Sequence, residues 1–354
     1  IKEVIEFFNG ERELKPTIVN TREEFYKNQE NFPYDFADVK GQESVKRALE
    51  VAAAGGHNLI MIGAPGSGKS MMAKRLPGIL PPLSLGESLE TTKIHSVAGK
   101  LGKDSSLIAT RPFRSPHHTI SQVAMVGGGA NPQPGEISLA HHGVLFLDEL
   151  PEFNRSVLEV LRQPLEDRHI SISRAKYSLE YPASFMLVAS MNPCPCGYYN
   201  HPTKACVCNP GQVQRYLNRI SGPLLDRIDI QIEIVPVPFE KISEKQQAES
   251  SASIRERVIC ARKMQEKRFA NHPGVYCNAQ MESRLLHLYA EPDEQGLNLL
   301  RNAMTRLNLS ARAYDRILKV ARTIADLDHS EQVTSIHLAE AISYRNLDRE
   351  SWAG

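Results

Sequence analysis

The sequence predicts an α/β domain with a doubly wound parallel sheet, followed by a smaller all-α domain. Three observations support this fold class. Short apolar runs typical of buried strands alternate with helical segments through the first two thirds of the 354 residues. A glycine-rich loop lies between one such strand and a helix. Beyond Pro238, helical periodicity dominates the sequence.

These changes in pattern divide the chain into three segments. We expect an N-terminal helix and linker over 1–35, an α/β domain over 36–238 and a helical domain over 239–354. The chain opens in an amphipathic helix without an initiator Met, which we interpret as the start of a fragment that lacks a preceding domain. Lys and Arg number 42 against 41 Asp and Glu, so no overall basic field points to nucleic acid. No apolar run approaches the roughly 18 residues that span a bilayer, so no membrane partner is expected.

The first motif is the loop Gly63-Ala64-Pro65-Gly66-Ser67-Gly68-Lys69-Ser70, which fits the pattern G-x-x-x-x-G-K-[ST] of a phosphate-binding loop (P-loop). An apolar run over 58–62 precedes it and a helical segment that starts at Met71 follows, and this is the context that the pattern requires. Glycines let backbone N–H groups surround phosphate oxygens, and the helix N-terminus adds positive potential. We expect Lys69 to reach the β- and γ-phosphates of ATP and Ser70 to hold Mg²⁺. The alternative is a glycine-rich turn with an incidental lysine.

The second motif is an apolar run, Val144–Leu147, that ends in Asp148 and Glu149. It is typical of a buried parallel strand with two carboxylates at the edge where open α/β sheets bind ligands. Asp148 is then placed to hold Mg²⁺ through water, and Glu149 to polarise the attacking water. The alternative is a strand end with two solvated acids.

The other expected elements follow from periodicity and turn signals. A glycine- and proline-rich stretch over 95–142 predicts a functional or mobile segment. A strand over 185–192 ends in Asn192, and Arg227 precedes the last strand, 230–235. We expect a helix that ends at Gly55-Gly56, helices near 85–92 and over 154–166, a hairpin over 168–181, and helices over 242–270, 280–290, 293–307, 312–327 and 334–346.

These motifs together resemble the AAA+ ATPases, and most closely their magnesium-chelatase-like ComM/YifB family. The similar segments are Arg111–His118, Gly143–Glu149 and 192–197, and the resemblance covers about residues 1–350. It implies an α/β P-loop core with an all-α lid, an insert over 93–142 and a hairpin over 168–181. Family members carry an N-terminal domain like that of the Lon protease, and we expect this domain to be absent here.

The resemblance also implies roles for single residues. Lys69, Ser70, Asp148 and Glu149 keep the roles given above. Asn192 would be a sensor that orients water, Arg227 an arginine finger that acts on a neighbour's ATP, and Arg312 a second sensor. Gly41 and Gln42 would contact adenine, and Met71 would also belong to the nucleotide site. Arg316 lies one helical turn from Arg312 and competes with it, and a surface charge is the alternative for Arg312.

The implied activity is ATP-driven movement on DNA by a homo-oligomeric, hexameric ring that migrates branched junctions. From the residues alone, Arg111, Arg114, Arg174 and Lys176 are placed to line a channel and meet phosphates, or else lie on solvated loops. A chelatase-type motor that inserts magnesium into a porphyrin is the second reading. A nucleotide-controlled scaffold for protein partners is the third.

Four of the six cysteines cluster as Cys194-Pro195-Cys196 and Cys206-Val207-Cys208. Four thiolates suit tetrahedral Zn²⁺, although common zinc motifs have wider spacing within each pair. His201 is an alternative ligand, and two disulfides or free thiols remain open. The cysteines do not form a distributed disulfide framework, which favours a reducing, cytoplasmic location.

Overall fold

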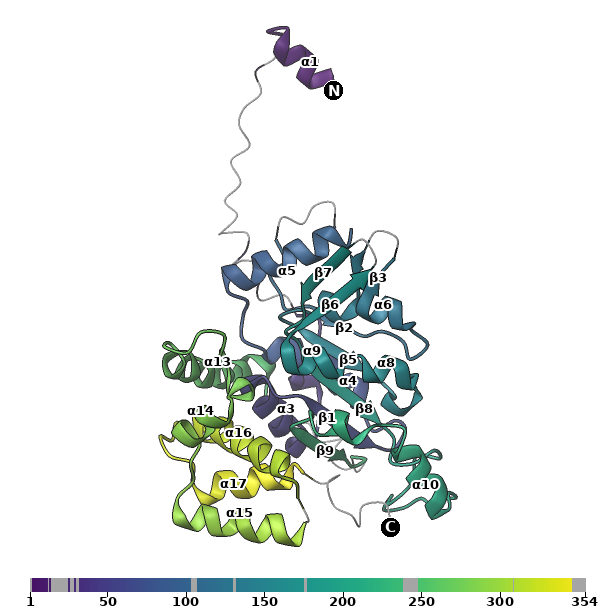
Figure 1. Cartoon of the computed structure of the whole chain (residues 1–354), viewed down its shortest axis with the longest axis vertical. Coiled ribbons are helices and arrows are strands. Elements are labelled where there is room, and N and C mark those ends of the chain that lie inside the picture. The colour runs from purple at the N-terminus through teal and green to yellow at the C-terminus, as the bar shows by residue number, and fades with distance from the viewer. Residues whose placement is uncertain are drawn as a thin grey trace.

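A computed structural model of the chain describes residues 2–11, 13, 25, 29, 32–102, 107–129, 132–174, 177–237, 248–307 and 309–345, without the side chains of 173, 174 and 177. A five-stranded parallel sheet forms the centre of the α/β domain (Figure 1). Its order is β2-β5-β8-β1-β9. The strands are β1 (Leu59–Gly63), β2 (Phe113–Arg114), β5 (Val144–Leu147), β8 (Met186–Met191) and β9 (Ile230–Ile234). This sheet and the helical domain after it confirm the predicted fold class.

The strand register brings the carboxyl ends of three strands to one edge of the sheet. Ile62 of β1 pairs with Met191 of β8, and Gly63 pairs with Ile234 of β9. The P-loop and Asn192 directly follow β1 and β8, so both leave the sheet at this edge. The predicted site therefore lies where parallel α/β sheets place their ligands.

Both faces of the sheet are buried, as expected for parallel strands. Side chains of β1 alternate between two apolar clusters: Leu59 and Met61 belong to one, and Ile60 and Ile62 to the other. The first cluster continues through α3 into the helices of the C-terminal part, so the two domains share one core. The boundaries at 35 and 238 stay predictions, and the second of them falls at residues 238–247, outside the described residues.

The helices of the α/β part surround the sheet. Local signals explain several of their ends: Gly56, with φ 70°, ends α3, and Ser84 forms a capping box with Glu87 at the start of α5. The helices of this part are α3 (Glu43–Gly55), α4 (Lys69–Arg75), α5 (Leu85–Val97), α6 (Gln122–Val126), α7 (Glu136–Leu139), α8 (Arg155–Glu159), α9 (Arg162–Asp167), α10 (Pro210–Leu217) and α11 (Gly222–Leu225). Its 3₁₀ turns are η2 (Phe36–Asp38), η3 (Leu76–Ile79) and η4 (Leu150–Glu152).

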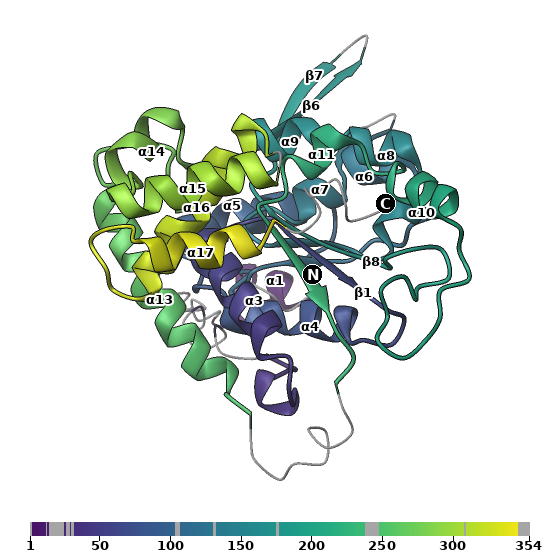
Figure 2. The same cartoon turned by 90° about the horizontal axis from the view of Figure 1, so that it is seen from below.

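The predicted hairpin is confirmed and projects beyond the body of the domain (Figure 2). Its strands are β6 (His169–Arg174) and β7 (Tyr177–Pro182), paired antiparallel. Its two tip residues, among them Lys176, lie outside the described residues. A second, short pair, β3 (Gly127–Gly128) and β4 (Gln133–Pro134), lies within the predicted insert.

The regular elements of the C-terminal part are helices in its described residues, and they pack on α3 and η3 (Figure 1). His57, at the end of α3, is fully buried between Asp229 (3.2 Å) and Thr323 of α16 (2.7 Å), which joins the two domains. The helices are α13 (Ser251–Arg268), α14 (Ser283–Tyr289), α15 (Glu294–Arg306), α16 (Ala311–Leu327) and α17 (Ser335–Ser343), with the 3₁₀ turn η5 (Asn278–Gln280); the chain begins in α1 (Lys2–Phe8).

Two predicted helices differ from the structure in their extent. The helix expected over 242–270 begins only at Ser251, after non-helical residues 248–250. The expected helix 154–166 is two helices, α8 and α9, with a break at Val160 and Leu161. Pro164 lacks a backbone N–H and its ring clashes with the carbonyl four residues earlier, so a continuous helix cannot pass through it. Helix α10 was not predicted, although Asn209-Pro210 with Gln212 forms a capping box at its start.

Candidate functional site

The P-loop leaves β1 and enters α4 at Lys69. Gly66 and Gly68 have φ of 80° and 93°, in the left-handed region that favours glycine. A Cβ at Gly66 would meet no atom within 4 Å, so the loop is open on that side. The hydroxyl of Ser67 is buried without a hydrogen-bond partner among the described residues. An open loop with an unpartnered donor fits a bound phosphate.

The ammonium group of Lys69 connects the P-loop to the end of β8. Its Nζ donates to the carbonyl oxygens of Gly63 (2.7 Å) and Ala64 (3.0 Å) and to Oδ1 of Asn192 (3.2 Å). Burial lowers the pKa of Lys69. None of these partners carries a charge, so a phosphate group would be the first anion in direct contact with this cation.

The acidic pair lies beside this lysine. Ser70 Oγ donates to Asp148 Oδ2 (2.6 Å), and Ser190 Oγ donates to Asp148 Oδ1. Both carboxylate oxygens are therefore held in place. Ser70 and Asp148 are the hydroxyl and carboxylate that a P-loop site uses for Mg²⁺, and their direct contact places both within reach of one ion.

Glu149 stands at the edge of the site rather than inside it. Its side chain is 56% exposed and lies 3.6 Å from Nδ1 of His118. Its φ of 54° is left-handed, an uncommon conformation for a non-glycine residue that turns the chain sharply after β5. The sequence reasoning assigned no role to His118 or Ser190. The signal for His118 was its place in the Arg111–His118 segment.

The predicted adenine contact has a defined position. Gly41 and Gln42 have φ of 69° and 64°. Gln42 Nε2 donates to the carbonyl of Val235 (2.7 Å), just beyond the carboxyl end of β9. Since that end lies beside the end of β1, the pair is on the P-loop side of the sheet. Met71 is 40% exposed in the first turn of α4. Contact of these residues with adenine stays a prediction.

Arg227 and Arg312 lie elsewhere. Together with Arg316 they line a cavity of about 140 Å³ between the two domains, with Glu166, Asp226, Asp315 and Lys319. Asn58, which precedes β1, donates to the carbonyl of Arg227 (2.9 Å), so Arg227 lies at the amino end of the strands. The P-loop lies at the opposite end, roughly 17 Å away for five residues at about 3.3 Å each. The structure therefore does not bring Arg227 or Arg312 to the P-loop of the same chain.

The ion pairs of this cavity distinguish the three arginines. Arg227 is nearly buried and donates to Glu166, not to Asp226 or Asp229. Arg312 is 68% exposed and bonds Asp226 (3.0 Å). Arg316 bonds the fully buried Asp229 (3.0 Å). Since Arg316 neutralises a buried carboxylate, it has a structural role, and Arg312 is the accessible cation of the two.

Two of the four cations expected to meet DNA have structural roles instead. Arg111 donates to the carbonyls of Pro81 (2.7 Å) and His142 (2.8 Å) and pairs with Glu87. Arg114 makes a two-fold contact with Glu136, 2.7 Å at each oxygen. The expectation that they line a channel is wrong, because their guanidinium groups are already occupied by carboxylates and carbonyls. The side chains of Arg174 and Lys176 lie outside the described residues.

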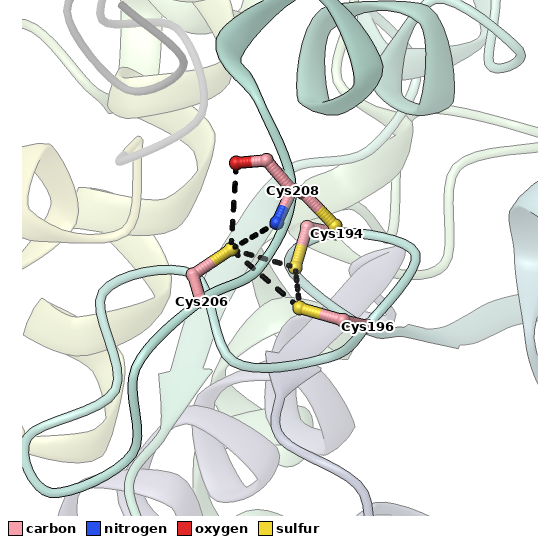
Figure 3. Close-up of side chains that lie close together, drawn as sticks. All are labelled: Cys194, Cys196, Cys206 and Cys208. Carbon is pink, nitrogen blue, oxygen red and sulfur yellow. Dashed lines mark hydrogen bonds between the residues drawn. The ribbon is translucent and has the colours of Figure 1, made fainter.

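The cysteine cluster comes together in three dimensions (Figure 3). The sulfur of Cys194 lies 3.3 Å from that of Cys196 and 3.7 Å from that of Cys206, and Cys196 and Cys206 are 3.5 Å apart. All four sulfurs, that of Cys208 included, lie within 4.8 Å of one another. These distances exceed the roughly 2.05 Å of a disulfide bond. His201 is not in this group; its Nδ1 instead accepts a hydrogen bond from the backbone N–H of Lys204 (3.1 Å).

Comparison with known proteins gives matches along most of the chain. Residues 35–242 match the family described as magnesium chelatase, subunit ChlI, and residues 248–345 match its C-terminal region. The chain is 50% identical over 320 residues to YifB of Escherichia coli, covering 89% of this chain and 61% of that protein. It is 44% identical over 349 residues to the competence protein ComM of Haemophilus influenzae, covering 98% and 67%. The 38 kDa magnesium-chelatase subunit of Rhodobacter capsulatus is 26% identical over 179 residues, covering 45% and 50%. The chain thus spans about three fifths of the length of YifB.

Proposed function

The chain belongs to the magnesium chelatase ChlI family of AAA+ P-loop nucleotide hydrolases, and we propose that it is an ATP-driven ring motor that acts on DNA. The observation that carries the proposal is the hydrogen-bonded set that joins the P-loop to the ends of two neighbouring strands, through Lys69 to Asn192 and through Ser70 to Asp148. The match to a competence protein directs the proposal to DNA.

In this proposal each residue of the set has one task in hydrolysis. Lys69 exchanges its carbonyl and amide partners for the β- and γ-phosphate oxygens. Ser70 and Asp148 hold Mg²⁺, which neutralises charge on the phosphates. Glu149 accepts a proton from the attacking water, and Asn192 orients that water. Glu149 is the exposed member of the set, so it can meet solvent water at the mouth of the site.

We further propose that the active unit is a homo-oligomeric ring, hexameric as the family resemblance implies. Arg227 and Arg312 lie at the far end of the strands from their own P-loop. An arginine side chain extends roughly 7 Å, less than half of the roughly 17 Å that separates the two ends of β1. Both arginines would therefore act on the nucleotide of a neighbouring subunit, where a guanidinium stabilises the charge that develops in phosphoryl transfer.

The DNA contact is proposed for the β6–β7 hairpin. The hairpin stands clear of the body of the domain, and its tip carries Arg174 and Lys176 in the sequence (Figure 2). Basic residues at the tip of a projecting hairpin can meet phosphates without displacing other structure. A cytoplasmic location is part of the proposal, because all six cysteines are unpaired.

The experiment that tests the proposal is the ATPase rate without DNA and with single-stranded, duplex and branched DNA. We expect DNA to raise the rate, and we expect Glu149→Gln to remove it while ATP still binds. Glu152→Gln is the matched control, since Glu152 is a nearby exposed acid that pairs with Arg219. A rate that no DNA changes, with no DNA binding, would refute the DNA motor and favour a chelatase-type motor. ATP binding without hydrolysis would favour a scaffold.

A further inference from the structure

We propose that Cys194, Cys196, Cys206 and Cys208 bind one structural Zn²⁺, and that this metal holds the P-loop and Asn192 in their hydrolytic arrangement. The metal site follows from the sulfur geometry alone. The role in hydrolysis rests on the proposed ATPase site.

The sulfur positions match a tetrahedral tetrathiolate site. Four thiolates at about 2.3 Å from Zn²⁺ lie about 3.8 Å from one another. The three measured separations are 3.3–3.7 Å, and all four sulfurs lie within 4.8 Å of one another. With four protein ligands the coordination of Zn²⁺ is complete, and no position remains for water or substrate. The site is therefore structural, and hydrolysis does not take place on it.

The loop that carries the cysteines needs such a centre. Residues 192–209 connect β8 to α10 and contain neither helix nor strand. Few loops of this length stay ordered inside a compact domain without support of their own. The side chain of Cys194 is fully buried, and the other three thiols are half-buried. One metal ion would join the two ends of the loop and supply folding energy that its side chains do not.

Two contacts connect this loop to the nucleotide site. Gly197, with φ 84°, lies directly against the P-loop, and a Cβ there would come 2.4 Å from Cδ of Pro65. At the other end of the loop, the Tyr216 hydroxyl of α10 lies close to the backbone of Asn192. Asn192 itself is two residues before Cys194 and accepts from Lys69. A loop fixed by metal would thus fix both the P-loop and the residue that orients water.

The first test measures the metal in the full chain, purified without chelator. We expect about one Zn²⁺ per chain by elemental analysis, and the intense visible absorption of a tetrahedral thiolate site after exchange for Co²⁺. Cys208→Ser should lower the zinc content well below one per chain. Cys260→Ser should leave it unchanged, because Cys260 is exposed on α13 and outside the cluster. Absence of both zinc and the cobalt spectrum in the wild-type chain would overturn the site, as would iron in its place.

The second test separates the role of the loop from the presence of the metal. Gly197→Ala should keep zinc at about one per chain, because no ligand is lost. Its Cβ would push against Pro65, and a misplacement of about 1 Å at a catalytic site costs up to roughly 100-fold in rate. We expect the variant to bind ATP more weakly and to hydrolyse it more slowly. Wild-type nucleotide affinity in Gly197→Ala would overturn the coupling and leave the zinc result standing. Loss of DNA stimulation alone would bear on the DNA motor and not on this site.

Discussion

Mixed rings give the sharpest test of how subunits share the hydrolytic work. Arg227→Ala removes the guanidinium and leaves the P-loop of the same chain untouched, because the two lie at opposite ends of β1. Glu149→Gln leaves the guanidinium in place and removes the base. Each variant alone should bind ATP and lose rate on the order of 10³-fold, a loss typical of an arginine finger for Arg227→Ala and of a general base for Glu149→Gln.

The two variants should rescue one another when they are mixed. In a random 1:1 ring, roughly one quarter of interfaces pair an intact Glu149 with an intact Arg227 from the neighbour. A quarter of the wild-type rate is on the order of 100-fold above either variant alone. The assay is steady-state ATP turnover after subunits are exchanged at low concentration and reassembled, with mixed rings verified by native mass spectrometry.

The matched control mixes Glu149→Gln with Lys69→Ala. Both changes affect the same nucleotide site of the same chain, so no interface in that mixture regains all its groups. We expect no rescue there. If verified mixed rings of Arg227→Ala and Glu149→Gln stay as inactive as either variant, the reasoning from the length of β1 is refuted. Equal rescue in the control mixture would refute it as well.

Three further outcomes are expected. Lys69→Ala should abolish ATP binding, measured by calorimetry, because it removes the cation at the P-loop, whereas Glu149→Gln should keep binding; equal affinity in both variants would contradict these roles. The double variant Arg174→Ala, Lys176→Ala should weaken DNA binding and flatten its salt dependence. Arg301→Ala in the helical domain is the control and should change neither. An unchanged salt dependence in the double variant would indicate that the hairpin tip is a solvated loop without DNA contact. Burial lowers the pKa of His57 below its usual range, so His57 binds a proton more readily in the unfolded chain than in the folded one. The free energy of unfolding should therefore be highest above about pH 6.5 and fall as the pH drops below this value. His57→Gln should reduce this pH dependence, measured by urea titrations at several pH values.

The strands and the nucleotide loop were predictable because their signals are local. A parallel strand buried on both faces is a mostly apolar run, as in β1 and β8, and the P-loop needs its glycines at fixed positions. Asp148 and Asn192 were predictable because strand ends share one edge of a parallel sheet. The role of Ser190 was not predicted, because the sequence does not indicate which carboxylate a serine inside a strand contacts.

The errors arose where a residue's role depends on a distant partner. Arg111 and Arg114 stand in a glycine- and proline-rich stretch that suggests a free loop, yet Glu87 and Glu136 bind them. Those acids lie 24 and 22 residues away, and no periodicity connects them to the arginines. The break between α8 and α9 differs, since Pro164 was visible and its effect on a helix is local.

The geometry of the interdomain cavity has a consequence for how the ring would work. Arg312 reaches the cavity from α16 and Arg227 from the α/β domain, and each is tied to a carboxylate near the amino end of β9. The same helix is joined to the α/β domain by Arg316 with Asp229 and by Thr323 with His57; Arg316 is partly exposed and the other three side chains are buried. These contacts, together with the apolar core that the two domains share, hold the helical domain on the sheet. Arg227 and Arg312 would therefore move as one unit with the sheet that carries them. A change in one subunit's nucleotide site would then reposition both arginines at the next site together, which is a direct route for ordered hydrolysis around a ring.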